Sequence, residues 1–371
     1  MAAPTRVLVL NERDPLHPRA GGAEVHLLEL GPRLRARGFE LTQLSCGFPG
    51  APRSGALPGL AIRRLGPLLG YYPRAALACA RETRRGHFDL VLDVLCKLPF
   101  FSPLYSAVPV LALCHHLLGE TAFLQAPWPI AAGVSLAEGL VPRLYRGAPF
   151  VADSESTRDD LVARGIARER IRVIPLGTRH PEPPARMPPP GLRVAYLGRL
   201  VPYKQVDVLL RAAARLADRF PELELVVIGR GPEQPRLESL AARLGIAGRT
   251  RFAGFASDAE RDRLLASSRV CVCPSKKEGF GLTVIEANAF GVPVVATDAP
   301  GLRDAVRDGE TGFLAPDGDA EAFAQRIGAI LADADLAARL SAGALAWSRR
   351  FDWERTADEL AGSLDAARRG A

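Results

Sequence analysis

Long apolar runs are absent from this chain, and their absence excludes an ordinary membrane-spanning helix. None of its 371 residues falls in a run of the roughly 18 apolar residues that such a helix needs. The opening stretch, MAAPTRVLVLNERDP, also lacks the long apolar segment and small-residue cleavage site of a secretory signal peptide. We therefore expect a cytoplasmic protein whose first strand lies near Val7 to Leu10.

Cysteine is scarce, and its spacing excludes the familiar structural metal sites. The six cysteines stand at positions 46, 79, 96, 114, 271 and 273, with no CxxC pair and no Cys/His spacing typical of zinc ligands. We expect reduced thiols that serve packing, as is usual in the cytoplasm.

Lysine is rare too, since the chain has four lysines and 44 arginines. The net charge of +7 is uneven: residues through Pro175 carry 21 basic against 15 acidic side chains, or +6, and the remainder carries 27 against 26, or +1. This excess permits peripheral contact with the inner face of the cytoplasmic membrane or with an anionic substrate, although a solvated arginine-rich surface is the simpler explanation. No basic cluster is interleaved with aromatic residues, so we expect no nucleic acid partner.

Short apolar runs alternate with helical patterns, and this alternation predicts the fold. RVLVL, ELTQLS, LAIRRL, DLVLDV, VPVLALC, PFVADS and IRVIP read as strands of a parallel sheet with helices on both faces. After a proline-rich linker, HPEPPARMPPPG (180–191), the pattern restarts with LRVAYLG, ELVVIG, TRFAGF, VCVCP and PVVATD, and helices follow to the end. We predict two Rossmann-like, doubly wound α/β domains, 1–180 and 191–350, facing a central cleft, and a C-terminal helix in 351–371 that packs back on the first domain.

The motif GRLVPYK, 198–204, follows a predicted strand and opens a predicted helix. It places the guanidinium of Arg199 and the ammonium of Lys204 near the helix start, which suits a diphosphate group. Ordinary surface charges at a helix end are the alternative. The rarity of lysine favours a site, because a retained lysine supplies a compact point charge.

Two further glycine turns follow strands. IGRGPEQ, 228–234, lacks the third glycine and the acidic residue of a dinucleotide fingerprint, so we expect a turn at Gly229 that lets a nucleotide base approach the backbone. RAGGAEV places Gly21 and Gly22 at a helix start, where their amides either meet a phosphate or serve only to begin the helix.

Two histidines end the strand VPVLALC. Neighbouring residues on a strand point to opposite faces, so we expect one of the two, His115 rather than His116, to reach the cleft and bind a hydroxyl or carry a proton. A purely structural role for both is the alternative. We predict no metal site, because no third ligand lies at matching spacing.

Two glutamates eight positions apart, Glu278 and Glu286, flank the glycine-rich turn of PSKKEGFGLTVIEA. If Arg199 and Lys204 hold phosphates, the two carboxylates are left to accept hydrogen bonds from hydroxyl groups, Glu286 from a ribose and Glu278 from a sugar. Paired acids also hydrolyse glycosidic bonds, but that function would leave the basic pair with no phosphate to hold.

With these motifs, the chain resembles the retaining glycosyltransferases of family 4, which have the two-domain GT-B fold. The matching pieces are GGAEV, ADSESTRDDL, GRLVPYK, GRGPE, EGFGLTVIEA and FGVPVVATDAPGLRDAVRDGETGFL, and the resemblance covers most of the chain from Val7 to about Phe351. Two departures are Gln205, where the family commonly has glycine, and IPLGT at 174–178, which replaces an asparagine-glycine turn.

The resemblance implies a hexosyltransferase-like enzyme of cell-envelope or polysaccharide synthesis. It would move a sugar from a nucleotide-diphosphate donor (GDP-, UDP- or ADP-linked) to a glycan, lipid-linked or small acceptor, with retained configuration and with no metal or cofactor. The catalytic residues implied are His115, Glu278, Arg199 and Lys204. The donor-binding residues implied are Gly21, Gly22, Arg199, Lys204, Gly229, Glu278, Gly279, Phe280, Gly281, Leu282, Thr283 and Glu286. A sugar-nucleotide epimerase or phosphorylase of the same fold, and a non-catalytic nucleotide-sugar binding module, are the alternatives.

Overall fold

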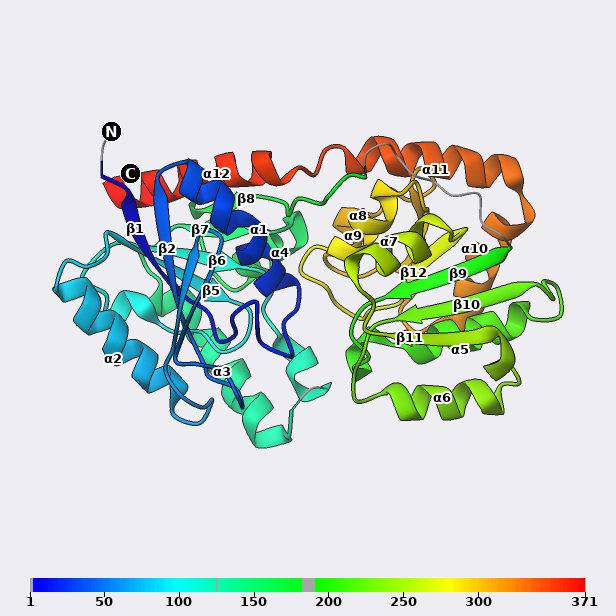
Figure 1. Ribbon diagram of the computed structural model, residues 1–371, viewed down its shortest axis with the longest axis horizontal. Helices are drawn as coiled ribbons and strands as arrows, with labels where there is room; N and C mark the ends of the chain where they lie inside the picture. The colour runs from blue at the N-terminus through cyan, green and yellow to red at the C-terminus, as the bar shows by residue number, and fades with distance from the viewer. Residues whose placement is uncertain (1–2, 125, 182–190, 371) are drawn as a thin grey trace. The chain divides into compact units, whose positions relative to one another are not determined.

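The computed structural model describes residues 3–124, 126–181 and 191–370, which form two compact units (Figure 1). Unit 1 combines Met1–Gly177 with Trp353–Ala371, and unit 2 is Thr178–Asp352. Most of the predicted linker, 182–190, lies outside the described residues. Each unit is built on a largely parallel sheet with helices between successive strands, so the predicted class of two Rossmann-like α/β domains is confirmed.

The described part of unit 1 forms an eight-stranded sheet in the order β3-β4-β2-β1-β5-β6-β7-β8. Its strands are β1 (Thr5–Leu10), β2 (Phe39–Ser45), β3 (Ser54–Leu57), β4 (Leu60–Arg64), β5 (Leu90–Leu95), β6 (Val110–Cys114), β7 (Phe150–Ala152) and β8 (Ile171–Val173). The prediction of a wholly parallel sheet is wrong at one edge, because β3 pairs with β4 antiparallel through a two-residue turn at Pro58 and Gly59. Strand β3 has only four residues, and every second one is exposed, so the sequence shows no apolar pattern that would predict it.

The helices of unit 1 cover this sheet and bring the end of the chain back to its start. They are α1 (Gly22–Ala36), α2 (Tyr71–Arg84), α3 (Trp128–Leu144), α4 (Glu155–Ala163) and α12 (Trp353–Arg369), with 3-10 turns η1 (Ser102–Leu104), η2 (Gly119–Leu124) and η3 (Arg168–Arg170). Arg37, which directly follows α1, donates hydrogen bonds to the carboxylates of Asp358, at 2.7 Å, and Glu354, at 3.0 Å, both in α12. Helix α12 is thus an integral part of unit 1.

The described part of unit 2 forms a six-stranded sheet in the order β11-β10-β9-β12-β13-β14, with every neighbouring pair parallel. Its strands are β9 (Leu192–Leu197), β10 (Leu223–Ile228), β11 (Thr250–Gly254), β12 (Val270–Cys273), β13 (Val294–Thr297) and β14 (Gly312–Ala315). The sequence predicted that only helices follow PVVATD, and this prediction is wrong because strand β14 also follows it. Strand β14 starts at Gly312, where a Cβ would lie 1.9 Å from the Val294 oxygen, so a glycine in this strand permits close pairing.

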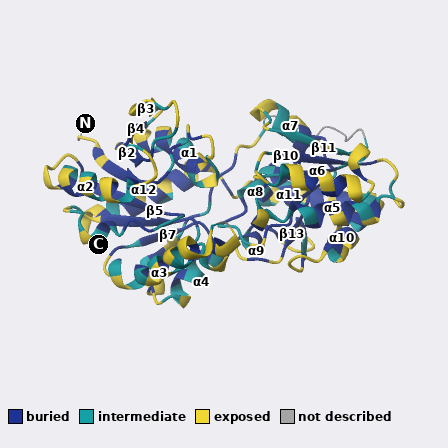
Figure 2. Cartoon of the chain, turned by 90° about the horizontal axis from the view of Figure 1, so that it is seen from below, coloured by how far each residue is buried: buried dark blue, intermediate teal, exposed yellow. Residues whose placement is uncertain are grey.

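The helices of unit 2 pack on its sheet around one large apolar core. They are α5 (Val206–Leu216), α6 (Gln234–Arg243), α7 (Asp258–Ala266), α8 (Leu282–Ala289), α9 (Leu302–Ala305), α10 (Ala320–Ala332) and α11 (Ala334–Ser348), with 3-10 turns η4 (Pro202–Lys204) and η5 (Ala247–Arg249). Figure 2 shows the buried residues concentrated on the strands and on the sheet-facing sides of these helices. Within the described ranges, no helix is both long enough and apolar enough to cross a membrane.

Candidate functional site

The carboxyl edge of the sheet in unit 2 gathers most of the residues predicted to bind a ligand. The turn after β9 carries Arg199 and Lys204, the turn after β12 carries Glu278, and helix α8 carries Glu286. Strands β9 and β12 are parallel neighbours, so the turns that follow them lie at the same edge of the sheet. In open α/β sheets this edge is where ligands bind.

Lys204 is the buried cation of this edge. Its ammonium hydrogen-bonds to Glu278 Oε1, and the two side chains are only 12% and 16% exposed. Burial acts to lower the pKa of Lys204, but Glu278, Tyr203 and Cys273 outweigh it, so the pKa lies above its ordinary value and the ammonium stays charged. An ammonium has three N–H donors, so the bond to Glu278 still leaves donors for a phosphate oxygen.

Arg199 differs from Lys204 because it is exposed. Its Nη2 donates a hydrogen bond to the Tyr203 hydroxyl at 2.9 Å, and the Tyr196 hydroxyl donates to its backbone oxygen at 2.9 Å. Among the residues that the structure describes, no carboxylate forms an ion pair with Arg199. Its guanidinium therefore keeps most of its fork of donors for an anion.

The backbone of the turn between Lys204 and α5 explains why the family commonly has glycine where this chain has Gln205. Gln205 adopts the left-handed conformation, with φ +49° and ψ +41°, and its Oε1 is buried without a hydrogen-bond partner. Glycine adopts this conformation without the clash of a Cβ. As a result α5 begins only at Val206, directly after this turn, while the charge of Lys204 is unaffected.

The glycines of IGRGPEQ hold two turns together. A Cβ on Gly229 would lie 1.9 Å from the Gly198 oxygen, and one on Gly231 would lie 1.9 Å from the Leu200 oxygen. The Leu200 amide also donates to the Arg230 oxygen at 2.9 Å. Backbone packing accounts for both glycines, so an approach of a nucleotide base to Gly229 stays a prediction.

The turn 278–281 positions the N-terminus of α8. Gly281 has φ +78°, a left-handed value that favours glycine, and begins the helix. The ring of Phe280 is 4% exposed and lies 5.2 Å from that of Phe351, so its side chain belongs to the core and only its backbone is available to a ligand. The first amides of α8, at Leu282 and Thr283, have no acceptor within the helix and lie at its positive end.

Glu286 lies inside α8, and none of the described residues makes a hydrogen bond or ion pair to its carboxylate. Burial raises its pKa to about 7, against the opposing effect of Arg261. Arg261, which the sequence analysis missed, donates to Asp258 at 3.0 Å and Asp262 at 2.7 Å. The one sequence clue was its place in ASDAERDRL, an exposed charged pattern typical of any surface helix.

In unit 1, His115 follows β6 and is held by Asp153, which follows β7. His115 Nδ1 and Asp153 Oδ2 are 2.5 Å apart, and both side chains are almost fully buried. An ionised Asp153 accepts the Nδ1 proton, which leaves the Nε2 lone pair, a buried atom without a partner, as the acceptor. Asp153 lies in ADSESTRDDL, where the sequence alone gave it no role.

A second histidine, His26 of α1, lies beside His115. The ring centres are 5.2 Å apart, and the ring of Trp353 is 5.7 Å from that of His26. Burial, and after it His115, lower the pKa of His26 well below its ordinary value, so this ring is neutral. Both of its nitrogens are buried without partners.

His26, His115 and Asp153 each offer one ligand atom within 4.8 Å of the others, which is the spacing of a potential metal site. The prediction of no metal site rested on ligand spacing in the sequence, whereas these three residues come together only in the fold, so it stays a prediction. The short hydrogen bond between His115 and Asp153 also fits a role without a metal, in which the carboxylate of Asp153 orients the imidazole of His115.

Gly21 and Gly22 begin α1 as predicted. The Gly21 amide donates to Glu24 Oε2 at 2.7 Å, so a carboxylate of the chain itself occupies this donor. Glu24 in turn accepts from Lys97 Nζ at 3.3 Å. A Cβ on Gly22 would meet nothing within 4 Å, so packing alone does not require glycine there.

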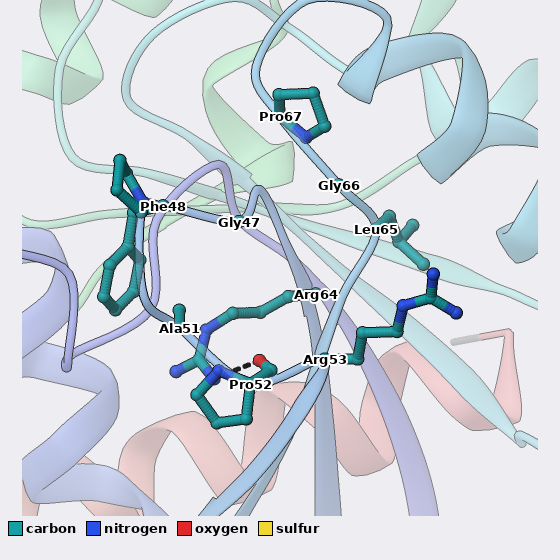
Figure 3. A pocket seen from close by; sticks show the side chains of 10 residues that line it. Gly47, Phe48, Ala51, Pro52, Arg53, Arg64, Leu65, Gly66 and Pro67 are labelled. Atoms are coloured by element: carbon teal, nitrogen blue, oxygen red, sulfur yellow. Dashed lines mark hydrogen bonds between the residues drawn. The ribbon is translucent and has the colours of Figure 1, made fainter.

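A separate hollow of about 570 Å³ opens in unit 1 between the loops that follow β2 and β4 (Figure 3). Its buried cation, Arg64, already donates to Asp14 at 2.8 Å and to the Pro52 oxygen at 3.0 Å, and lies 5.1 Å from the centre of the Phe48 ring. None of the residues predicted to bind a ligand lines this hollow. Because its buried cation is already paired, we assign this hollow no part in the site.

Known proteins resemble this chain over most of its length. The sequence profile described as "Glycosyl transferases group 1" matches residues 186–347, and that described as "Glycosyltransferase Family 4" matches 20–180. The D-inositol 3-phosphate glycosyltransferase of Streptomyces scabiei is 30% identical, over 98% of this chain and 92% of its own length. Among solved structures, the sucrose-phosphate synthase of Thermosynechococcus elongatus matches with a TM-score of 0.81 at 25% identity, over 97% of this chain and 98% of its own. HepE of Anabaena, solved with UDP-glucose, matches with a TM-score of 0.77 at 22% identity, over 97% and 99%.

Proposed function

This chain is a glycosyltransferase that belongs to family 4 and has the GT-B fold, and we propose that it moves a sugar from a nucleotide-diphosphate sugar to an acceptor hydroxyl, with retained configuration and without a metal ion. The observation that carries the proposal is the edge of unit 2 at which two cations, Arg199 and Lys204, stand with two carboxylates, Glu278 and Glu286.

The two cations fit the diphosphate of such a donor. Arg199 supplies a fork of donors, Lys204 supplies a buried point charge, and the positive end of α8 lies after Glu278. When the bond from sugar to diphosphate breaks, negative charge grows on the departing phosphate, and fixed cations stabilise it most at that moment. Side-chain cations can thus neutralise the charge that a divalent ion neutralises in metal-dependent reactions.

The two carboxylates fit the hydroxyl groups of the donor. We assign the ribose to Glu286, because none of the described residues makes a hydrogen bond or ion pair to its carboxylate, and the transferred sugar to Glu278, because it lies at the turn beside Lys204. In unit 1 the Nε2 lone pair of His115 is suited to accept a hydrogen bond from a hydroxyl of the sugar, since Asp153 holds Nδ1. The backbone of Gly279, Gly229, Gly21 and Gly22 is assigned to the donor on resemblance alone.

The test is a transfer assay in EDTA with UDP-, GDP- and ADP-linked sugars, in which release of the nucleoside diphosphate is measured with and without acceptors. Two similar proteins are named for phosphate-bearing compounds, so D-inositol 3-phosphate and hexose phosphates are the first acceptors to add. We expect release that depends on the acceptor, is insensitive to EDTA, and yields a product whose anomeric proton coupling in NMR matches that of the donor.

The alternatives predict other results in the same assay. An epimerase would change the donor sugar without an acceptor, a phosphorylase would require phosphate, and a binding module would release nothing. The proposed setting is the cytoplasm, in cell-envelope or polysaccharide synthesis, and the free, buried state of all six cysteines suits a reducing compartment.

A further inference from the structure

Helix α3 exposes apolar side chains where a surface helix ordinarily exposes charge. Together with turn η2 it presents a set of large hydrophobic residues, called here the α3 patch: Phe123 (43% exposed), Leu124 (45%), Trp128 (71%), Ile130 (59%) and Leu136 (70%). Figure 2 shows exposed and intermediate residues along this helix. A surface helix that is apolar on its outer side marks a surface that a partner covers.

Around the α3 patch two arginines and one glutamate, Glu120, are exposed. Residues 119–147 contain four charged residues, Glu120, Glu138, Arg143 and Arg146. Glu138 is fully buried, and its carboxylate accepts hydrogen bonds from the amides of Leu118, at 2.6 Å, and Gly119, at 2.9 Å. Arg143 and Arg146 are exposed at the end of α3. Within α3, the acidic side chain of Glu138 is therefore buried and the basic side chain of Arg143 is exposed.

The inner side of α3 fixes the patch in place. Ala131 and Val141 are buried, and Val141 packs in an apolar cluster with Tyr145 and Phe150. Glu138 also forms an ion pair with Arg164 of the segment after α4, at 3.6 Å. The outward apolar side chains thus stand on an anchored helix that has its own core contacts.

We propose that the α3 patch docks unit 1 on the surface of a bilayer that contains anionic phospholipid. The aromatic and aliphatic side chains enter the boundary between headgroups and acyl chains, as the apolar face of an interfacial helix does. Arg143 and Arg146 bind the phosphates of the headgroups, and the excess of 21 basic over 15 acidic residues through Pro175 adds attraction. This binding does not depend on the proposed transfer reaction. If both hold, the acceptor is a molecule presented at a membrane surface.

The chain contains its own probe for this binding. Trp128 is 71% exposed, whereas Trp353 is 3% exposed and Trp347 is half-buried. With vesicles of phosphatidylglycerol and phosphatidylcholine, we expect tryptophan emission to shift to the blue and to be quenched by brominated acyl chains. Vesicles of phosphatidylcholine alone should give a much smaller effect. Trp128→Phe should still sediment with the anionic vesicles while losing most of the spectral shift.

Variants then locate the surface. Trp128→Ser combined with Leu136→Gln should lower vesicle partitioning by at least about tenfold, because two large apolar groups no longer leave water. Arg143→Gln with Arg146→Gln should reduce the preference for anionic vesicles. Leu69→Ser, which changes a residue that is 91% exposed in unit 1 but outside the α3 patch, is the matched control and should bind normally.

Three results would overturn the proposal: no binding of the wild type to anionic vesicles, equal binding by the patch variants, or a wild-type dimer in light scattering that Leu136→Gln converts to monomer. The last would assign the patch to a second copy of the chain. Stabilisation by a nucleoside diphosphate reports on unit 2 and is measured in parallel, so failure of membrane docking and failure of the donor site are separate results.

Discussion

Lys204 and Glu278, 74 positions apart in the sequence, hydrogen-bond to each other at the carboxyl edge of unit 2. The pair joins the turn after β9 to the turn after β12, which are the two segments proposed to hold the diphosphate and the sugar of the donor. Because each side chain is largely buried, neither charge is well solvated without the other. Binding of the two parts of the donor is therefore expected to be coupled.

This coupling predicts a non-additive effect on stability. Lys204→Met and Glu278→Gln should each lower the free energy of unfolding by about 1–3 kcal/mol, because each leaves a partly buried group without its partner. The double variant should lose clearly less than the sum of the two, as measured by urea unfolding. Lys276→Ala is the control, since its pair with Asp317 at 3.8 Å is exposed and should contribute little. Additive losses would mean that the pair is not formed in solution.

Glu286 predicts a dependence of stability on pH. Its pKa is raised from 4.5 to about 7 in the folded protein, so the folded state holds this proton more tightly than the unfolded chain. The free energy of unfolding should therefore fall as the pH rises from about 4.5 to about 7, and level off above that range. Glu286→Gln removes the ionisation and should be more stable than the wild type at pH 8, by at most about 3 kcal/mol.

The measurement for Glu286 is urea unfolding at pH 5 and pH 8. Glu238→Gln, a change of an exposed acid on α6, should keep the wild-type dependence. The same Glu286→Gln variant should bind nucleoside diphosphates more weakly at pH 8, in spite of its higher stability. Parallel pH profiles for wild type and variant would contradict the burial of this carboxyl group.

Gly229 predicts a large steric effect. A Cβ at this position would lie 1.9 Å from the Gly198 oxygen, so Gly229→Ala must separate the turns after β9 and β10. We expect a loss of about 3 kcal/mol or more in stability. Gly248→Ala is the matched change, because a Cβ there meets nothing within 4 Å, and it should be neutral or slightly stabilising. Equal melting temperatures for the two variants would refute the close contact.

Asp153 predicts an effect on catalysis rather than on binding of the nucleoside diphosphate. The amide NH2 of Asp153→Asn can donate a hydrogen bond to His115 Nδ1 and so favours the tautomer in which Nε2 carries the hydrogen. We expect transfer to slow by about 10²- to 10⁴-fold, while stabilisation by nucleoside diphosphates persists. Nitrogen NMR of the imidazole reports the tautomer, and Asp159→Asn, at an exposed position of α4, is the control. Full activity of Asp153→Asn would remove His115 from the proposed mechanism.

Local patterns in the sequence were enough to predict most of the fold and to single out the charged residues that gather at the carboxyl edge of unit 2. The β10 run, LELVVI, is apolar and is followed by glycine, so both its strand and its turn were readable. Arg199, Lys204, Glu278 and Glu286 were found for a similar reason, since each lies in or beside a glycine turn after a buried strand.

Contacts between distant segments were not readable. Nothing in GRLVPYK predicts that Lys204 pairs with Glu278, because the pairing depends on β9 and β12 being neighbours in a sheet whose order differs from the sequence. His26 and Asp153 reach His115 from other strands and helices for the same reason. Strand β3 has too few buried residues for an apolar pattern, and the left-handed turn at Gln205 is visible only in backbone angles.

The most direct measurement is thermal stability in EDTA against UDP, GDP and ADP, for the wild type, Lys204→Ala and Lys276→Ala. A nucleotide at a hundredfold over its dissociation constant should stabilise the wild type and Lys276→Ala by about 2.7 kcal/mol. We predict that one base gives this shift and that Lys204→Ala, though folded, loses most of it. Equal stabilisation of all three proteins, or of none of them, would contradict a donor site at Lys204.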